Sequence, residues 1–179
     1  MGQIKKYHPV KLIIGFIFQD EAVFNKAKTI LERRFGRIDF ESQTFAFNHT
    51  AYYEKELGKD LKRKFITFQR LIPAQNLPQI KIKTNKIERK LSPRNRRLIN
   101  IDPGYLDLSK LILATTKDYR HRIYLNKGIY AEATLFYQDK NFQPWEWTYP
   151  DYKSAEYLSA FNEIRDIYAQ QMKAINLAS

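Results

Sequence analysis

Apolar residues in the first hundred positions follow the patterns of both strands and helices. The run from Val10 to Phe18 is almost continuously apolar, which is typical of a strand that is covered on both faces. After Asp20, a residue type that favours helix N-caps, apolar residues recur at helical spacing as far as Gly36. This pattern predicts a helix over 21–35, and a similar stripe predicts a second helix over 77–91.

Shorter apolar patterns predict three further strands in the same half of the chain. Residues 39–47 are rich in β-prone types, and residues 64–72 alternate between apolar and polar positions. A short strand over 98–101 is followed by Asp102-Pro103-Gly104, a tripeptide typical of a turn. The resulting order is βαββαβ. We therefore predict an α+β fold with a ferredoxin-like core, in which both helices cover one face of an antiparallel sheet.

The second half of the chain is predicted to extend this core. Residues 111–114 are apolar and short enough for a strand. Asn126-Lys127-Gly128 separates two β-prone segments, 122–125 and 129–137, and predicts a β-hairpin. Apolar residues from Tyr157 to Met172 then share one face of a C-terminal amphipathic helix. No repeat or linker divides residues 1–179, so we predict a single domain.

Composition excludes several classes of protein. The chain of 179 residues has no cysteine, which rules out disulfide bonds, thiolate metal sites and a cysteine nucleophile. Its longest apolar stretch, Leu12 to Phe18, has seven residues, whereas a membrane-spanning helix needs roughly 20. No signal-peptide pattern is recognisable at the start. We therefore expect a cytoplasmic protein that is not inserted in a membrane.

Positive charge is concentrated in one part of the chain. The 31 Lys and Arg residues exceed the 19 Asp and Glu residues, which gives a net charge of +12. Residues 61–100 hold 12 of these bases and a single acid. Such a block, which begins with Lys62, Arg63 and Lys64, favours an anionic partner such as nucleic acid or a nucleotide-like phosphate compound. A solvated basic face or a protein partner are the alternatives.

Common cofactor motifs are missing from the sequence. The six glycines are too scattered for a phosphate-binding loop, and the three histidines do not have the spacing of zinc ligands. The sequence therefore argues against a P-loop nucleotidase and against a dedicated transition-metal site. The cofactor is unknown from the sequence, although carboxylates could still bind magnesium.

Ionisable residues gather on and around the predicted strands between 100 and 132. The imidazole of His121 could act as an acid or base near neutral pH, and Asp102 or Glu132 could orient it. Basic side chains in the same stretch could bind phosphate or carboxylate oxygens; these are Lys110, Lys117 and Arg122. The alternative is structural: Asp102 caps a turn, His121 is a partly buried histidine, and Glu132 pairs with a lysine.

Aromatic residues crowd the segment from Trp145 to Tyr152. Aromatic faces next to basic residues bind the bases of single-stranded nucleic acids. The same pattern also fits a lid that packs on the hydrophobic core.

Between Asn100 and Leu135 (NIDPGYLDLSKLILATTKDYRHRIYLNKGIYAEATL), and again at 147–152 (WTYPDY), the chain resembles the prokaryotic family called domain of unknown function 4416. The likeness extends over most of the chain and includes the opening VKLIIGFIF. The family has no established activity to transfer. The resemblance implies that typical family motifs include Thr84-Asn85, Glu88, the DPGY sequence, Lys110, Lys117, His121, Arg122 and Glu132.

Three functions follow from these observations as hypotheses. The leading one is a cytoplasmic α+β domain that binds an anionic ligand through the basic block 62–97 and the 102–132 cluster, with Asn85 among the binding residues. The second is a small enzyme that acts on a phosphorylated substrate with His121 as acid or base. The third is a protein–protein interaction module that uses the C-terminal helix and the aromatic segment. Oligomeric state is open.

Overall fold

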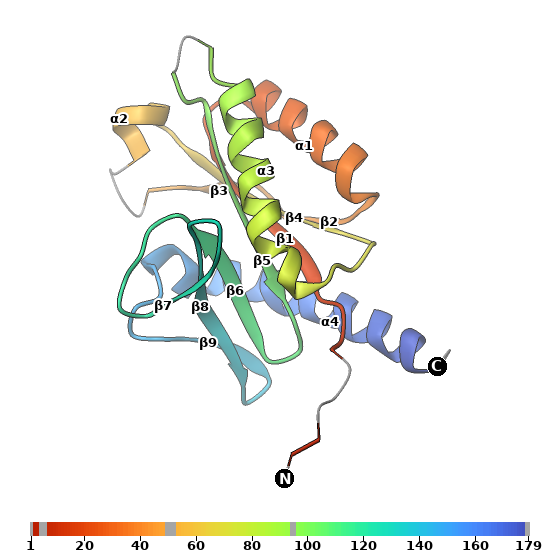
Figure 1. The fold of residues 1–179 in the computed structure, drawn as a ribbon. Coiled ribbons are helices and arrows are strands. Elements are labelled where there is room, and N and C mark those ends of the chain that lie inside the picture. The colour runs from red at the N-terminus through yellow and green to blue at the C-terminus, as the bar shows by residue number, and fades with distance from the viewer. Residues whose placement is uncertain (1, 4–6, 49–52, 94–95, 178–179) are drawn as a thin grey trace.

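The computed structural model describes residues 2–3, 7–48, 53–93 and 96–177, and it has an α+β fold built on one large antiparallel sheet (Figure 1). Arg94, part of the predicted basic block, lies outside the described residues. The helices are α1 (Glu21–Phe35), α2 (Glu54–Leu57), α3 (Leu77–Lys90) and α4 (Ala155–Leu177). The strands are β1 (Lys11–Phe18), β2 (Ile38–Glu41), β3 (Phe45–Ala46), β4 (Lys62–Phe68), β5 (Ile99–Leu106), β6 (Lys110–Thr115), β7 (Arg122–Asn126), β8 (Ile129–Gln138) and β9 (Asn141–Pro144).

The sheet has the strand order β2-β4-β1-β5-β6-β8-β7, with β3 paired to β4 and β9 paired to β8. Every pairing is antiparallel. The last two strands of the main path, β8 and β7, form the hairpin that the sequence predicts, and β7 is the edge strand. Lys127 and Gly128 both have positive φ angles, 53° and 74°, as a tight hairpin turn requires.

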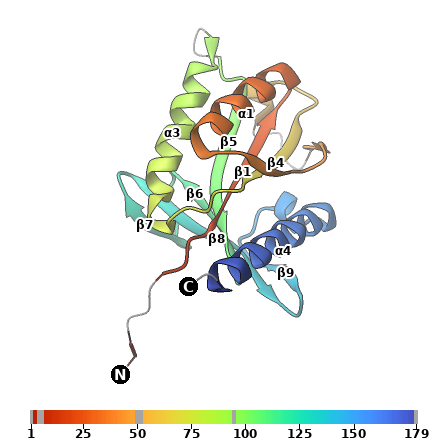
Figure 2. The same cartoon turned by 90° about the vertical axis from the view of Figure 1, so that its right-hand side faces the viewer.

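Helices cover both faces of the sheet (Figure 2). Leu12, Ile14 and Phe16 of β1 share one core with α1 and α3. Ile13, from the same strand, points to the opposite face and packs in a second core with α4. Because successive side chains of a strand alternate between faces, this two-sided cover explains the continuous apolar run in β1.

Local sequence signals set the ends of α1. The side chain of Asp20 accepts a hydrogen bond from the backbone N–H of Ala22 at 2.8 Å, as an N-cap does. Gly36, with a φ of 99°, ends the helix and donates its N–H to the carbonyl of Glu32 at 2.9 Å. The predicted bounds of this helix, 21–35, are confirmed.

The predicted turn at Asp102-Pro103-Gly104 is wrong, because these residues lie inside β5, which pairs with β1 along its whole length. The backbone groups of Ile101 face away from β1 and toward α3. Alternation puts the nitrogen of Pro103 on the same side, where pairing with β6 covers only Gly104–Leu106. Because Pro103 has no strand partner on this side, its missing N–H removes no hydrogen bond between strands. Strand β5 can therefore contain Asp102-Pro103-Gly104.

Other elements differ from the predictions in extent. The predicted strand 39–47 is two short strands, β2 and β3, and β4 begins at Lys62 and ends at Phe68 instead of covering 64–72. β9 was not predicted. Among the described residues, none of the helices combines the length and the apolar character needed to cross a membrane.

Candidate functional site

A cavity of about 760 Å³ opens where β5 and β6 separate. Its walls come from α3, the first half of β5, the end of β6, the β7–β8 hairpin and the segment 149–152, and Ile17 of β1, Arg63 of β4, Phe47 and Tyr53 complete the lining. Small-molecule sites typically have volumes of about 300–1,000 Å³, so this cavity can hold a ligand of nucleotide size.

Two side chains of α3 replace the missing strand partner of β5 at this opening. The carboxylate of Glu88 accepts the backbone N–H of Ile101 at 2.5 Å, and the ammonium of Lys81 donates to the carbonyl of Ile101 at 3.2 Å. Both backbone polar groups of Ile101, on the edge of β5, are thereby satisfied without a neighbouring strand. Pro103, which has no N–H to offer to β6, lies just beyond this point. The sequence of β5 and the polar residues of α3 thus keep the sheet open.

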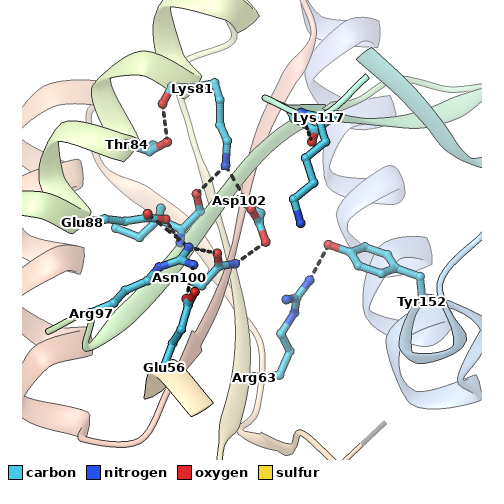
Figure 3. A network of polar contacts seen from close by, with 12 residues as sticks. Glu56, Arg63, Lys81, Thr84, Glu88, Arg97, Asn100, Asp102, Lys117 and Tyr152 are labelled. Atoms are coloured by element: carbon cyan, nitrogen blue, oxygen red, sulfur yellow. Dashed lines mark hydrogen bonds and ion pairs between the residues drawn. The ribbon is translucent and has the colours of Figure 1, made fainter. Parts of the chain in front are cut away.

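A chain of ion pairs and hydrogen bonds lines the α3 side of the cavity (Figure 3). Asp102 pairs with Lys81 at 3.0 Å and accepts a hydrogen bond from the amide of Asn100. Arg97 donates to Asn100 and pairs with Glu88 at 3.2 Å. Burial alone would raise the pKa of the Asp102 carboxyl, but the positive charges of Lys81 and Arg63 hold that pKa below its usual value. Asp102 is therefore ionised at neutral pH.

Arg63 faces Asp102 across the cavity (Figure 3), and its side chain is one of the most deeply buried in the protein. It is 2% exposed, and its guanidinium donates one hydrogen bond, to the hydroxyl of Tyr152. The guanidinium carbon also lies 4.9 Å from the ring centroid of Phe65 and 5.1 Å from that of Tyr152. Within the described part of the chain, Arg63 has no ion pair and its Nε has no hydrogen-bond partner.

Glu132, Arg122 and Lys117 form the wall opposite α3. The Nε of Arg122 lies 2.9 Å from a carboxylate oxygen of Glu132, and its two terminal nitrogens donate to the carbonyl of Lys117 and to the hydroxyl of Tyr149. These contacts fix the orientation of the Arg122 guanidinium at the cavity.

His121 lies behind this wall and does not line the cavity. Its Nε2 is 3.2 Å from Glu132, and its ring stacks on that of Trp147, with centroids 5.3 Å apart. Its Nδ1 is buried and has no hydrogen-bond partner among the described residues. Of the three residues predicted to do catalysis, Asp102 and Glu132 reach the cavity, but they lie on opposite walls, and only Glu132 contacts His121.

The structure separates the predicted binding residues into two groups. Arg63, Asn85, Lys117 and Arg122 line the cavity. Lys62 and Lys64, which alternate with Arg63 along β4, form ion pairs with acids of α1 and β2. Lys110 pairs with Asp107 at 2.7 Å in the β5–β6 turn. The basic block of the sequence is therefore divided between the two faces of the sheet and does not make one continuous surface.

Several cavity residues were not singled out in the sequence analysis, although the basic block 62–97 and the aromatic segment 145–152 contain four of them; the five are Lys81, Arg97, Asn100, Tyr149 and Tyr152. One of them could have been recognised from its position in the sequence. Lys81 lies four positions after Leu77 and three before Thr84, on a stripe of α3 that is buried. A charged residue at such a position has to find a buried partner, which here is Asp102. The other four depend on which segments the fold brings together.

We expect Asp102→Asn to weaken the fold near neutral pH by about 1–3 kcal/mol, because the ammonium of Lys81 would lose its ion pair. The pKa of Asp102 is lower in the folded chain than its usual value of 3.8. The contribution of the carboxylate is therefore complete above pH 3.8 and is lost as the pH falls through the lower, folded-state pKa. Urea unfolding at several pH values should show the difference from wild type shrinking in acid. A difference that stays constant below pH 3.8 would contradict the assignment.

Comparison with known proteins adds a family. A family model described as a domain of unknown function (DUF4416) matches residues 8–168. Neither the curated proteins nor the solved structures contain a match. Within the ranges that the structure describes, no three His, Asp or Glu side chains are grouped so that they could hold a metal ion.

Proposed function

The chain belongs to the DUF4416 family, which supplies no activity, and we propose from its cavity that it binds an anionic, nucleotide-like phosphate compound between β5 and β6. The observation that carries this proposal is the state of Arg63. A guanidinium taken out of water is costly unless a counter-charge or a full set of hydrogen bonds compensates for it. Arg63 is 2% exposed and donates to a neutral phenol. Asp102 and Asp151 act on Arg63 from beyond ion-pair distance, and a bound phosphate or carboxylate would supply a counter-charge in direct contact with the guanidinium.

Other lining residues support an anionic ligand. Six basic side chains face four acidic ones in the cavity: Arg63, Lys81, Arg89, Arg97, Lys117 and Arg122 against Glu88, Asp102, Glu132 and Asp151. Asp102 and Glu88 are already matched by Lys81 and Arg97 on the α3 side. Glu132 is matched by Arg122, so the rest of the cavity lining, which includes Arg63, has more bases than acids. A phosphate group bound beside Arg63 would make charge-assisted hydrogen bonds.

Binding is better supported than acid–base catalysis by His121. An acid or base has to come within hydrogen-bond distance of the atom whose proton it transfers. His121 is separated from the cavity by the side chain of Glu132. The cavity residues instead offer donors to an anion, which is the chemistry of a binding site.

We also propose that the unit formed by β1, α1, β2, β4, α3 and β5 is ferredoxin-like. The order β2-β4-β1-β5, with α1 and α3 packed in one core, supports this topology. The cavity then lies at the free edge of that unit, where the added strands β6, β8 and β7 diverge from it.

Thermal unfolding in the presence of phosphate compounds tests the proposed binding. We expect inorganic pyrophosphate or a nucleotide to raise the melting temperature by roughly 5–10 °C at about 100 times its dissociation constant. Arg63→Met should lose this shift, because it removes the buried positive charge while keeping an apolar side chain of similar length. Arg63→Met should still fold, since no carboxylate contact of Arg63 is broken.

The neighbouring residue provides the control. Lys62→Met removes the same charge one position earlier in β4, on the face that carries Glu21 and not in the cavity. This variant should keep the ligand-induced shift. Equal loss of the shift in both variants would mean that net charge, and not the cavity, attracts the anion. The absence of any shift in the wild-type protein would refute the proposal.

A further inference from the structure

We infer that the ligand of the cavity is the phosphorylated end of a single-stranded nucleic acid, whose next bases stack on Tyr124 and Tyr130. This inference rests on the proposed function and names the substrate class of the same site. It is carried by the β7–β8 hairpin, which forms one wall of the cavity and then continues beyond it.

The register of the hairpin places two tyrosines on the cavity side of the sheet. Arg122 is paired with Glu132, and both line the cavity. Two residues further along, Tyr124 is paired with Tyr130. Because residues two apart in a strand, and residues directly opposite in a pair, lie on the same face, the tyrosines continue the face that bears Arg122 and Glu132. Their ring centroids are 5.4 Å apart, in an edge-to-face arrangement.

The aromatic surface beside the cavity is open to solvent. Tyr124 is 58% exposed and Tyr119, just before the strand, is 59% exposed. These are the two most exposed aromatic side chains among the described residues; Tyr7, Tyr149 and Trp145 are less exposed. A large aromatic side chain left uncovered beside a binding cavity is suited to stack on a planar ligand.

Charge makes a nucleic acid the best match for this surface. Residues 117–127 contain four bases and one acid. Two of the bases, Arg120 and Lys127, are exposed and lie outside the cavity lining. A free nucleotide would contact only the cavity. A single-stranded nucleic acid that extends out of the cavity would place its following phosphates near these cations and its bases on the tyrosines. An acidic peptide would match the charge but would not use the aromatic faces.

Isothermal titration calorimetry with unlabelled probes tests this inference. The probes are single-stranded hexa-adenylates with a 5′-phosphate, with a 3′-phosphate, or with hydroxyls at both ends, together with inorganic pyrophosphate and hexaglutamate. We expect one phosphorylated oligonucleotide to bind at least about tenfold more tightly than the unphosphorylated one. Arg63→Met should remove this advantage. Hexaglutamate should bind far more weakly than the phosphorylated oligonucleotide.

Tyrosine variants separate stacking from charge. Tyr124→Ala should weaken binding of the phosphorylated oligonucleotide by roughly 5- to 150-fold and leave pyrophosphate binding unchanged. Tyr7→Ala, which removes another exposed tyrosine at 54% exposure, should have no effect. Equal effects of the two tyrosine variants, or equal affinity for hexaglutamate, would overturn the inference. If pyrophosphate binds but no oligonucleotide does, the inference fails while the proposed function stands; if neither binds, both fail.

Discussion

Replacing Gly104 with alanine is expected to lower the free energy of unfolding by more than about 3 kcal/mol. A Cβ atom at this position would lie 2.3 Å from the backbone carbonyl oxygen of Ile112 and 2.8 Å from a methyl carbon of Leu113. The oxygen belongs to the neighbouring strand β6 and cannot rotate away as a side chain could. Relief would require β5 and β6 to separate at the last pair before the cavity.

Two other glycines provide a graded comparison. At Gly15, the same change would bring the Cβ atom to 3.1 Å from the ring of Phe65, a contact that a small side-chain movement can relieve. At Gly2, the Cβ atom would meet nothing within 4 Å. We expect the loss of stability, measured by urea unfolding followed by circular dichroism, to rank Gly104, then Gly15, then Gly2. A mild effect at Gly104 would mean that β5 and β6 are less tightly paired than the structure indicates.

Local signals in the sequence explain why part of the fold could be predicted. The apolar run of β1, the caps of α1 and the Asn126-Lys127-Gly128 turn each act within a few residues of chain. The predicted α+β class and the antiparallel hairpin follow from such signals, and both are confirmed. Propensities of this kind are readable because the residues that decide the conformation are neighbours in sequence.

Pairing between distant segments explains what was missed. Asp102-Pro103-Gly104 has the local propensity of a turn, but pairing with β1 along all of β5 outweighs it. The predicted strand 39–47 is divided because β2 and β3 meet different parts of β4. β9 owes its extended form to pairing with β8, at residues 141–144, for which the sequence analysis made no prediction.

The candidate site likewise contains residues that could be predicted from the sequence and residues that could not. Charge and residue type identified Arg63, Lys117, Arg122, Asp102 and Glu132, all of which line the cavity. Residue type does not distinguish Arg63 from its neighbours Lys62 and Lys64. Side chains of β4 alternate between the two faces of the sheet, and the position of β4 in the sheet places Arg63 on the face of the cavity. The contribution of Lys81 and Tyr152 depends on the packing of α3 and of the 149–152 segment against β5 and β4, which one sequence does not reveal.

Asp39→Ala is expected to destabilise the protein by about 3–5 kcal/mol, because it would leave the ammonium of Lys11 buried without a counter-charge. The side chain of Lys11 is fully buried, forms an ion pair with Asp39 and donates a 2.8 Å hydrogen bond to Gln171 of α4. Burial lowers the pKa of Lys11, and Asp39 opposes this effect. In the variant only the lowering influence of burial would remain. The cost of the buried charge would then appear directly in the free energy of unfolding.

The stability of the Asp39→Ala variant should also change with pH in a defined direction. With Asp39 removed, the folded-state pKa of Lys11 falls further below its usual value of 10.5, so the unfolded chain binds the proton more tightly than the folded one. The stability of Asp39→Ala, measured by urea unfolding and compared with wild type, should therefore recover as the pH rises from the folded-state pKa toward 10.5. Adding Lys11→Met should restore most of the loss at neutral pH, since the double variant no longer buries a charge at this site. Asp166→Ala, at a carboxylate that is 74% exposed, should change stability little, and an equal loss there would argue against a buried pair as the cause.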